Sequence, residues 1–453
     1  MIYPTEPMTA SEIARACKGR LISGDPDFKF TSVTTDSRTT DSGTLFIPLK
    51  GERFDGHDFI KNVADSGAGG YIFSSGKCTP DGKCAAIEVN DTSDAILDIA
   101  AYYRSRFGNL TVIGLTGSVG KTTTKGMIAS VLSEKYKTHS TEKNYNNNIG
   151  VPLTLFGLKS DDEAAVVEMG MSGFGEIKVL SECARPDIAV ITNIGTCHIE
   201  FLGSREGILK AKCEIFDGLK KGGKVVLNGD DSYLAGLDGK TELDITYVGI
   251  KSDLCRYKAE NIRLSESGAD FEADGKKYHI NVAGGHNIYN ALTAIAVGYM
   301  MNMTYEEIRA GLESYKSEGI RQNIISYGGI KIINDCYNAS PDAMKAEADV
   351  LESLAAKRRI AVLGDMAELG EMGAELHGDV GRYLNKKNID TLVTVGSLAR
   401  HIAENAKNIP SHCFDDCDGA TAFLKSYLSE GDAVLIKASR CMKFERISKA
   451  LCE

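Results

Sequence analysis

Short apolar runs alternate with helical patterns over most of the chain, and each run ends in small or polar residues. The pattern predicts strands at 111–115, 164–168, 188–194, 331–333, 360–363, 391–395 and 433–437. Strands that alternate with helices in this way are typical of a mostly parallel sheet covered by helices. We therefore predict an α/β fold with a central, mostly parallel sheet and a Rossmann-like C-terminal domain. That last segment has no GxGxxG, which argues against a bound dinucleotide.

The first hundred residues form a unit of their own. Thr9 and Glu12 form a capping box, which predicts a short helix that stops at Gly19. A strand-like run follows at 45–49, and a helix over 91–106 leads to a linker.

Two further changes in pattern mark where the central segment ends. Residues 242–282 alternate like strands and predict an antiparallel edge or flap, and near 317–322 the chain leaves this segment. We predict domains at 1–107, 108–317 and 318–453.

The strongest chemical signal is the stretch TVIGLTGSVGKTTTK at 111–125, in which a strand runs into a glycine-rich turn and then a helix. Glycines let the backbone approach a phosphate, Lys121 supplies a cation, and the Thr122 hydroxyl suits Mg²⁺. The usual pattern has Gly where Leu115 stands, so the signal is GxxGxxGKT. We assign the nucleotide phosphates to Gly117, Ser118, Gly120, Lys121, Thr122 and Thr123.

Other polar residues follow the predicted strands, where ligands bind in open α/β sheets. Glu168 ends a buried strand and is either a Mg²⁺ ligand or a structural carboxylate. His198 follows the next strand and is either structural or catalytic. Lys212 lies in a helical run, where lysines are usually solvated. The loop at 144–148 carries four asparagines, among them Asn146 and Asn147, and suits polar binding.

Two more groups have both a functional and an ordinary interpretation. Thr35, Ser37, Arg38, Lys50 and Arg53 suit a diphosphate or sugar ligand, or form a turn and a solvated charge cluster. The amides of Asn287 and Asn290, at the start of an Ala-rich helix, either read a base edge or cap the helix.

Composition narrows the class of protein. The net charge of −10 argues against a nucleic-acid-binding surface. Twelve scattered cysteines without CxxC spacing indicate free thiols in a reducing compartment. We find no signal-peptide pattern and no apolar stretch of about 18 residues, so we expect a cytoplasmic protein without membrane insertion. At 453 residues, two to four domains are expected.

The motifs together resemble those of the Mur ligases, ATP-dependent amide-forming enzymes of peptidoglycan precursor synthesis. The resemblance rests on TTDSR, LFIPLKGERFDGHDF, TGSVGKTTT, EKNYNNNIG, VVEMGMSGFGEI, TNIGTCHIEFLGSREGILKAKCEIF, GGHNIYNAL, NDCYNASPDAM, LGDMAELG and KASR, in the family's order. It implies an N-terminal domain for a UDP-sugar, a central ATP domain and a C-terminal domain that closes over both.

The resemblance also implies roles for individual residues. Lys121 and Thr122 match the phosphate lysine and the Mg²⁺-binding hydroxyl, and Glu168 matches a ligand of a second Mg²⁺. His198 matches a histidine near that metal, and Lys212 matches a lysine that the family carries as a carbamate. On the nucleotide side, the matching residues are Asn287, Asn290, Arg321, Asp335, Tyr337 and Asn338; the uridine nucleotide is expected near Thr35, Ser37, Arg38, Lys50 and Arg53.

The implied reaction activates a carboxylate with ATP as an acyl phosphate, which an amine then attacks. TTDSR and NDCYNASPDAM favour UDP-N-acetylmuramoyl-tripeptide and D-alanyl-D-alanine as substrates, and we expect a monomer. Two departures from the family are KASR in place of KGSR, and GIRQN around Arg321.

Three alternatives remain. The first is a sister ligase, or a folylpolyglutamate synthetase, that adds a single amino acid. The second is a GTP-binding switch, which the absence of an NKxD motif disfavours. The third is a non-catalytic precursor binder, which Lys121, Glu168 and Lys212 disfavour.

Overall fold

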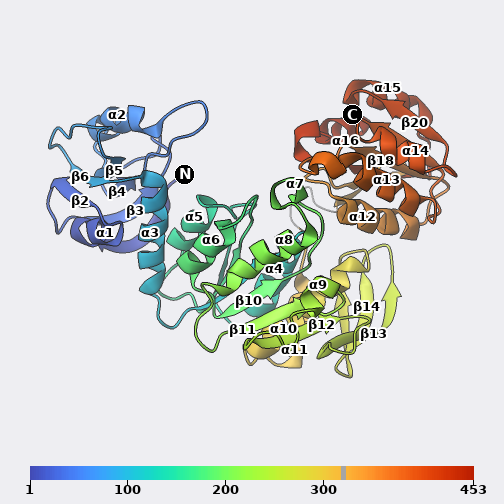
Figure 1. The fold of residues 1–453 in the computed structure, drawn as a ribbon, viewed down its shortest axis with the longest axis horizontal. Helices are drawn as coiled ribbons and strands as arrows, with labels where there is room; N and C mark the ends of the chain where they lie inside the picture. Colours follow the sequence, from blue (N-terminus) through green and yellow to red (C-terminus); the bar gives the residue numbers. More distant parts are fainter. Residues whose placement is uncertain (318–322, 453) are drawn as a thin grey trace.

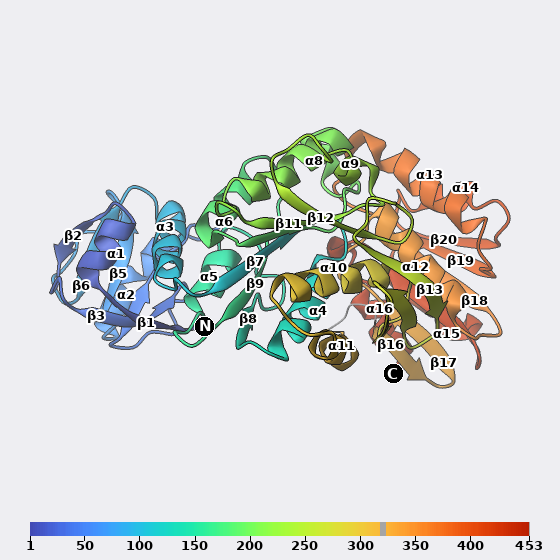
Figure 2. The same ribbon diagram turned by 90° about the horizontal axis from the view of Figure 1, so that it is seen from below.

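The computed structural model describes all residues except 318–322 and 453. Its described strands form three sheets, one at each end of an elongated molecule and one between them (Figures 1 and 2). Arg321 lies outside the described residues, so its predicted role stays a prediction. We keep the domain boundaries 1–107, 108–317 and 318–453 as a proposal.

The N-terminal sheet has the strand order β1-β3-β4-β5-β6-β2, in which β3, β4, β5 and β6 run parallel and the two outer strands antiparallel. Its strands are β1 (Tyr3–Thr9), β2 (Arg20–Ser23), β3 (Lys29–Thr34), β4 (Thr44–Phe46), β5 (Gly70–Ser74) and β6 (Ala85–Val89), and its helices are α1 (Ala10–Ala16), η1 (Gly56–Phe59), α2 (Ile60–Asp65) and α3 (Thr92–Ser105).

The capping box at Thr9 and Glu12 is present, and both of its hydrogen bonds are formed. The helix that it starts ends at Ala16, three residues before the predicted stop at Gly19. The strand predicted at 45–49 ends at Phe46, two residues before Pro48, which has no N–H to donate to a strand ladder.

The central sheet has the order β15-β14-β13-β12-β11-β10-β7-β9-β8. Its strands are β7 (Thr111–Thr116), β8 (Thr138–Ser140), β9 (Ala164–Glu168), β10 (Ile188–Ile191), β11 (Lys224–Asn228), β12 (Asp244–Gly249), β13 (Tyr257–Leu264), β14 (Ala269–Ala273) and β15 (Lys276–Ile280). Its helices are α4 (Lys121–Ser133), α5 (Gly150–Phe156), α6 (Glu176–Ala184), α7 (Ile199–Leu202), α8 (Arg205–Cys213), η2 (Glu214–Phe216), α9 (Ser232–Ala235), α10 (His286–Met300) and α11 (Tyr305–Ser314).

The pairs from β8 to β13 are parallel, and only β13-β14-β15 is antiparallel. The prediction of an antiparallel edge over 242–282 is therefore right for its last three strands and wrong for β12. Every residue of β9 and β10 is buried, as expected for parallel strands covered on both faces.

The C-terminal sheet has the order β16-β17-β21-β18-β19-β20, with only β16 antiparallel. Its strands are β16 (Asn323–Tyr327), β17 (Ile330–Asn334), β18 (Arg359–Gly364), β19 (Thr391–Val395), β20 (Ser411–Phe414) and β21 (Ala433–Lys437); its helices are α12 (Pro341–Ser353), η3 (Gly370–Met372), α13 (Gly373–Leu384), α14 (Arg400–Asn405), α15 (Cys417–Tyr427), η4 (Arg440–Met442) and α16 (Glu445–Leu451). The four predicted strands are present, and β16 and β20 are additional edges.

Direct contacts hold the three units together. Helix α3 lies against α5 and α6 of the central unit (Figure 1), and its buried Arg104 donates from Nε to Ala184 O at 3.1 Å. On the other side, Glu266 in the β13–β14 turn forms an ion pair of 2.7 Å with Lys331 and accepts the Ala355 N–H. No helix in the described part of the chain has the length and apolar character needed to cross a bilayer.

Candidate nucleotide and metal site

The phosphate loop joins the end of β7 to the start of α4, and two of its glycines have conformations that side chains disfavour. Gly117 has φ +156° and Gly120 has φ +81°. A Cβ at Gly117 would lie 1.9 Å from Thr192 Oγ1, so only glycine fits there. The backbone therefore makes the close approach predicted for these glycines, although the group next to Gly117 is Thr192 of the same chain.

Two amides of this loop are used within the protein. Ser118 N donates to Asn193 O at 3.1 Å, and Val119 N donates to Asn193 Oδ1 at 3.0 Å. The first intrahelical bond of α4 runs from Thr124 N to Gly120 O, so the amides at 121–123 have no partner within the helix. The helix start, more than the loop before it, is therefore the anion-binding part of this stretch.

Lys121 and Thr122 occupy the first turn of α4. In this ligand-free structure Lys121 Nζ donates to Gly117 O at 2.8 Å, which folds the cation back over the loop. The Thr122 hydroxyl donates to Glu168 Oε2 at 3.0 Å, although the two residues are 46 positions apart.

Glu168 is almost fully buried at the end of β9 and has three polar neighbours. Besides Thr122, Asn146 Nδ2 donates to its Oε1 at 2.9 Å, and Lys125 Nζ lies 3.5 Å from its Oε2. Lys125 is buried as well and also donates to Lys143 O at 3.0 Å. Lys125 was not predicted as a site residue; its position four residues after Lys121, in the phosphate-loop helix, was the available signal.

A cavity of about 830 Å³ lies between the central and C-terminal units. It brings together most of the predicted nucleotide and metal residues: Ser118, Gly120, Lys121, Thr123, Asn146, Asn147, Glu168, His198, Lys212, Asn290, Asp335, Tyr337 and Asn338. Gly117, Thr122 and Asn287 lie behind this lining, where they brace the residues that form it.

Lys212 is 2% exposed and lines this cavity from α8. Burial, and after it the nearby Lys121 cation, lowers the pKa of its amine to about 7. Among the described residues, Lys212 forms no ion pair with a carboxylate. The expectation that lysines on helices are solvated is wrong for Lys212, because it lies on the buried face of α8.

The two asparagines of α10 connect this helix to α4. Thr124 Oγ1 donates to Asn290 Oδ1 at 2.9 Å, and Asn290 Nδ2 donates to Asn287 Oδ1 at 2.9 Å. Asn287 in turn donates to Ala283 O at 2.6 Å. The amides thus brace the phosphate-loop helix, and α10 has no side-chain cap, so the capping interpretation does not hold. Recognition of a base edge stays a prediction.

The C-terminal unit contributes the loop after β17. Lys437, at the end of the neighbouring β21, is 2% exposed, forms an ion pair with Asp335 and donates to Asn338 O at 3.0 Å. Lys437 was not predicted as a site residue, although KASR marked its position. The pair fixes the shape of the loop that faces the phosphate loop.

His198 is held by the C-terminal unit. Its Nδ1 lies 2.5 Å from Glu368 Oε2, in the LGDMAELG motif, and the proximity of the His198 ring lowers the pKa of Glu368. Both residues have left-handed backbones, with φ +63° and +62°. Glu368 was also missed, because nothing local connects two positions 170 residues apart.

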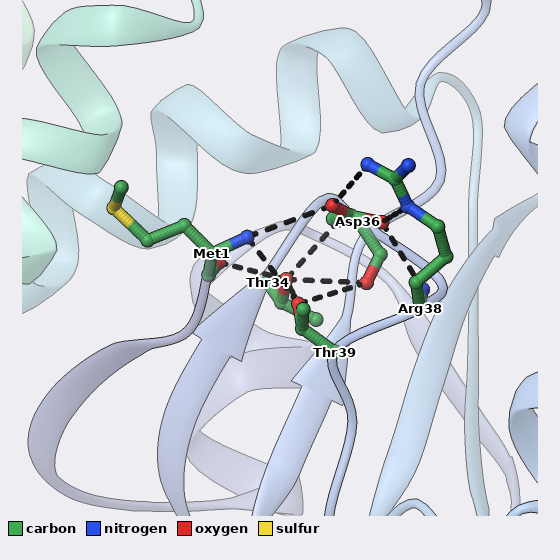
Figure 3. A network of polar contacts seen from close by, with 5 residues as sticks. All are labelled: Met1, Thr34, Asp36, Arg38 and Thr39. Atoms are coloured by element: carbon green, nitrogen blue, oxygen red, sulfur yellow. Dashed lines mark hydrogen bonds and ion pairs between the residues drawn. The ribbon is translucent and has the colours of Figure 1, made fainter.

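The N-terminal candidates lie outside the cavity. Figure 3 shows Arg38 beside Asp36, and the Arg38 Nε and Nη2 atoms each lie 2.8 Å from a carboxylate oxygen of Asp36. These hydrogen bonds hold the pKa of Asp36 far below its usual range. The Arg38 side chain is 85% exposed. Thr35 and Ser37 are half-buried, and Lys50 and Arg53 are exposed. They therefore lie at or near the protein surface, outside the lining of the cavity.

Comparison with known proteins identifies the class. Three family models match the chain: "Mur ligase family, catalytic domain" at 29–104, "Mur ligase middle domain" at 115–298, and "Mur ligase, glutamate ligase domain" at 320–440. The fold and the site therefore define an ATP-dependent ligase that forms amide bonds. The chain belongs to the Mur ligase family, as its motifs predicted.

The relatives are similar over nearly their whole length. A UDP-N-acetylmuramoyl-tripeptide–D-alanyl-D-alanine ligase of Bacillus subtilis is 41% identical over 98% of both chains, and its Escherichia coli namesake is 33% identical over 98% of both. A crystal structure of MurF from Acinetobacter baumannii has a TM-score of 0.93 at 33% identity and 99% coverage of both chains. MurF of Thermotoga maritima in complex with ADP has a TM-score of 0.82 at 30% identity, with 92% of this chain and 96% of that chain covered.

Proposed function

We propose that this chain joins D-alanyl-D-alanine to UDP-N-acetylmuramoyl-tripeptide, with ATP converted to ADP and phosphate. The observation that carries the proposal is the single cavity in which the phosphate-loop helix, Glu168 and Lys212 face Asp335 and Asn338 of the C-terminal unit. The relatives named for this reaction cover the chain from end to end.

The chain's own residues supply positioning and charge. A carboxylate is a poor acyl donor, so its oxygen attacks the γ-phosphorus of ATP, ADP leaves, and an acyl phosphate forms on the tripeptide. The dipeptide amine then attacks the carbonyl carbon, loses a proton, and phosphate leaves. Lys121 and the amides at 121–123 stabilise the charge on the transferring phosphoryl group.

The residues around Glu168 fit a Mg²⁺ ion. Thr122 Oγ1 and Glu168 Oε2 are 3.0 Å apart. Hydroxyl and carboxylate oxygens are ligands that Mg²⁺ prefers, so Thr122 and Glu168 would serve the two ions expected at this site. When bound, Mg²⁺ would neutralise phosphate charge. Among the described residues, no group of three or more His, Cys, Asp or Glu side chains could hold a metal ion by itself, so ATP, water and a modified lysine would have to complete such a site.

Lys212 fits the role of that modified lysine. With a pKa of about 7, a substantial fraction of its amine is uncharged near neutral pH, and an uncharged amine adds to CO₂ to give a carbamate and one released proton. The negatively charged carbamate would be attracted to the Lys121 cation. The same cation repels the protonated amine of an unmodified Lys212. His198 lines the same cavity and belongs beside this metal site.

We further propose that the surface formed by Thr35, Ser37, Arg38, Lys50 and Arg53 holds the uridine nucleotide. The exposed guanidinium of Arg38 and the neighbouring hydroxyls suit a diphosphate. A reaction that uses ATP and a UDP-linked precursor belongs in the cytoplasm, which agrees with twelve free cysteines. We expect the monomer to be active.

Phosphate release tests the function directly. Purified protein with ATP and Mg²⁺ is given UDP-N-acetylmuramoyl-tripeptide with D-alanyl-D-alanine, with single D- or L-amino acids, or with no amine. Release that requires the dipeptide supports the proposal. Release with a single amino acid would make the chain a sister ligase, and release without the UDP-tripeptide would overturn the ligase reaction.

A further inference from the structure

We propose that Glu368 is a positioning residue that orients His198 from the C-terminal domain, so that this part of the site is complete only when the domain is docked. The inference deepens the proposed function and rests on it. Four observations carry it: the contact itself, the chemistry of the histidine ring, the backbones of both residues, and the docking of the segment around Glu368.

The contact joins Nδ1 of His198 to Oε2 of Glu368 at 2.5 Å, across the boundary between the central and C-terminal units. The two groups are close but are not aligned as a hydrogen bond. Such contacts often align only when substrates bind. His198 lines the cavity and is 21% exposed at its side chain, whereas Glu368 is outside the lining at 45%. The carboxylate therefore acts on the cavity only through the imidazole.

Ring chemistry gives this contact a consequence. A carboxylate at Nδ1 accepts a hydrogen bond from Nδ1–H and so favours the tautomer that carries its proton there, which leaves the lone pair on Nε2. The same arrangement orients histidines beside metals, where a carboxylate holds one nitrogen and the other faces the ion. Glu368 thus decides which nitrogen His198 presents to a ligand in the cavity.

Both backbones are held in a conformation that residues other than glycine rarely adopt. His198 has φ +63° and ψ +21°, and Glu368 has φ +62°. Such backbones are strained, and the residues that adopt them cluster at functional sites. Two of them face each other across a domain boundary here, which fixes the direction in which each side chain leaves its loop.

The segment around Glu368 is docked through its backbone as well. Glu368 O accepts the Glu200 N–H at 3.3 Å. Gly370, with φ +52°, packs so closely that a Cβ there would lie 3.2 Å from Glu200 Cγ. Helix α7, which starts directly after His198, therefore meets η3 by main-chain contact. The side-chain contact is made only while this docking lasts.

The test uses the full chain labelled with ¹⁵N-histidine. The protein has eight histidines, and a His198→Gln variant identifies the signals of this ring. Spectra are recorded at pH 8.5, where histidine rings are generally neutral. We compare wild type with Glu368→Ala, which removes the acceptor, and with Glu368→Gln, which keeps an uncharged one. Glu371→Gln, in the adjacent η3, is the matched control.

The wild type and the Glu371→Gln control should show the Nδ1–H tautomer at His198. Glu368→Ala should shift this ring toward the Nε2–H tautomer, and Glu368→Gln should restore it in part. In the ligase assay, Glu368→Ala should lower kcat by about 10- to 100-fold, the usual effect of losing such a carboxylate. Its KM for ATP should change by less than about threefold, because Glu368 lies outside the cavity lining and acts on the cavity only through His198.

An unchanged His198 tautomer in Glu368→Ala would overturn the proposal, and so would a kcat equal to that of the control. The tautomer is read without substrates. If Glu368→Ala shifts the His198 tautomer but the wild type ligates a different amine, the role of Glu368 stands and D-alanyl-D-alanine is refuted as the substrate.

Discussion

Replacement of Lys212 by methionine should stabilise the substrate-free protein while it abolishes ligation. The side chain is 2% exposed, and its pKa is lowered from 10.5 to about 7, first by burial and then by Lys121. Between these two pKa values, Lys212 is more often protonated in the unfolded chain than in the folded protein, so the folded protein binds fewer protons. Stability therefore rises with pH across this window, and the lysine destabilises the protein most below pH 7.

The magnitude follows from the shift. A difference of about 3.5 pKa units corresponds to a penalty of about 5 kcal/mol below pH 7, at 1.36 kcal/mol per unit. The penalty falls to about 2 kcal/mol at pH 9 and disappears above pH 10.5. Methionine has a similar length and no charge, so Lys212→Met should regain an amount of this order at pH 7 and about half as much at pH 9.

Urea unfolding in CO₂-depleted buffer, followed by circular dichroism, measures the effect at pH 7 and pH 9. Lys212→Arg is the control, because its guanidinium keeps its charge at both values and its deficit relative to methionine should not change. Bicarbonate should raise the wild-type midpoint, as the carbamate relieves the buried cation, and should leave the methionine variant unaffected. A methionine variant that is no more stable than wild type at pH 7, or a gap that widens toward pH 9, would refute the reasoning.

Three further predictions concern the phosphate loop and the N-terminal surface. Lys121→Met should lower kcat by about 10²–10³-fold, the scale for one preorganised donor, and near-normal turnover would exclude it from phosphate binding. Gly117→Ala should abolish ADP binding in calorimetry, because its Cβ would meet Thr192 Oγ1 at 1.9 Å; an unchanged Kd would mean that the loop moves freely. Arg38→Ala should raise the KM for the UDP-tripeptide about tenfold or more and leave the KM for ATP unchanged, whereas an effect confined to ATP would place Arg38 in the wrong site. The same substitution should return the pKa of Asp36 toward its usual range, which carboxyl NMR would detect.

Features encoded by neighbouring residues could be predicted from the sequence. The capping box depends on contacts within a few positions of each other. The phosphate loop and the strands of the C-terminal sheet also have partners distant in the chain, but their glycine pattern and apolar runs lie in neighbouring residues. The edge strands β16 and β20 were missed because only one side of each is paired and their patterns are weak; β20 alternates between exposed and half-buried positions.

The features that could not be predicted depend on contacts between distant residues. The amides of Ser118 and Val119 donate to Asn193, about 75 positions later, and no local pattern indicates that contact. The partners Lys437 of Asp335 and Glu368 of His198 are likewise distant in the chain. Both partners lie in motifs quoted from the sequence, Lys437 in KASR and Glu368 in LGDMAELG. Only the fold shows which residues they contact.

Transfer of an oxygen label tests the central claim most directly. UDP-N-acetylmuramoyl-tripeptide labelled with ¹⁸O in its terminal carboxylate is incubated with ATP, Mg²⁺ and D-alanyl-D-alanine, and both products are analysed by mass spectrometry. The account predicts one ¹⁸O atom in the released phosphate and a UDP-linked product heavier by one intact dipeptide residue pair. Unlabelled phosphate would contradict the acyl phosphate, and a product extended by a single residue would contradict the dipeptide as substrate.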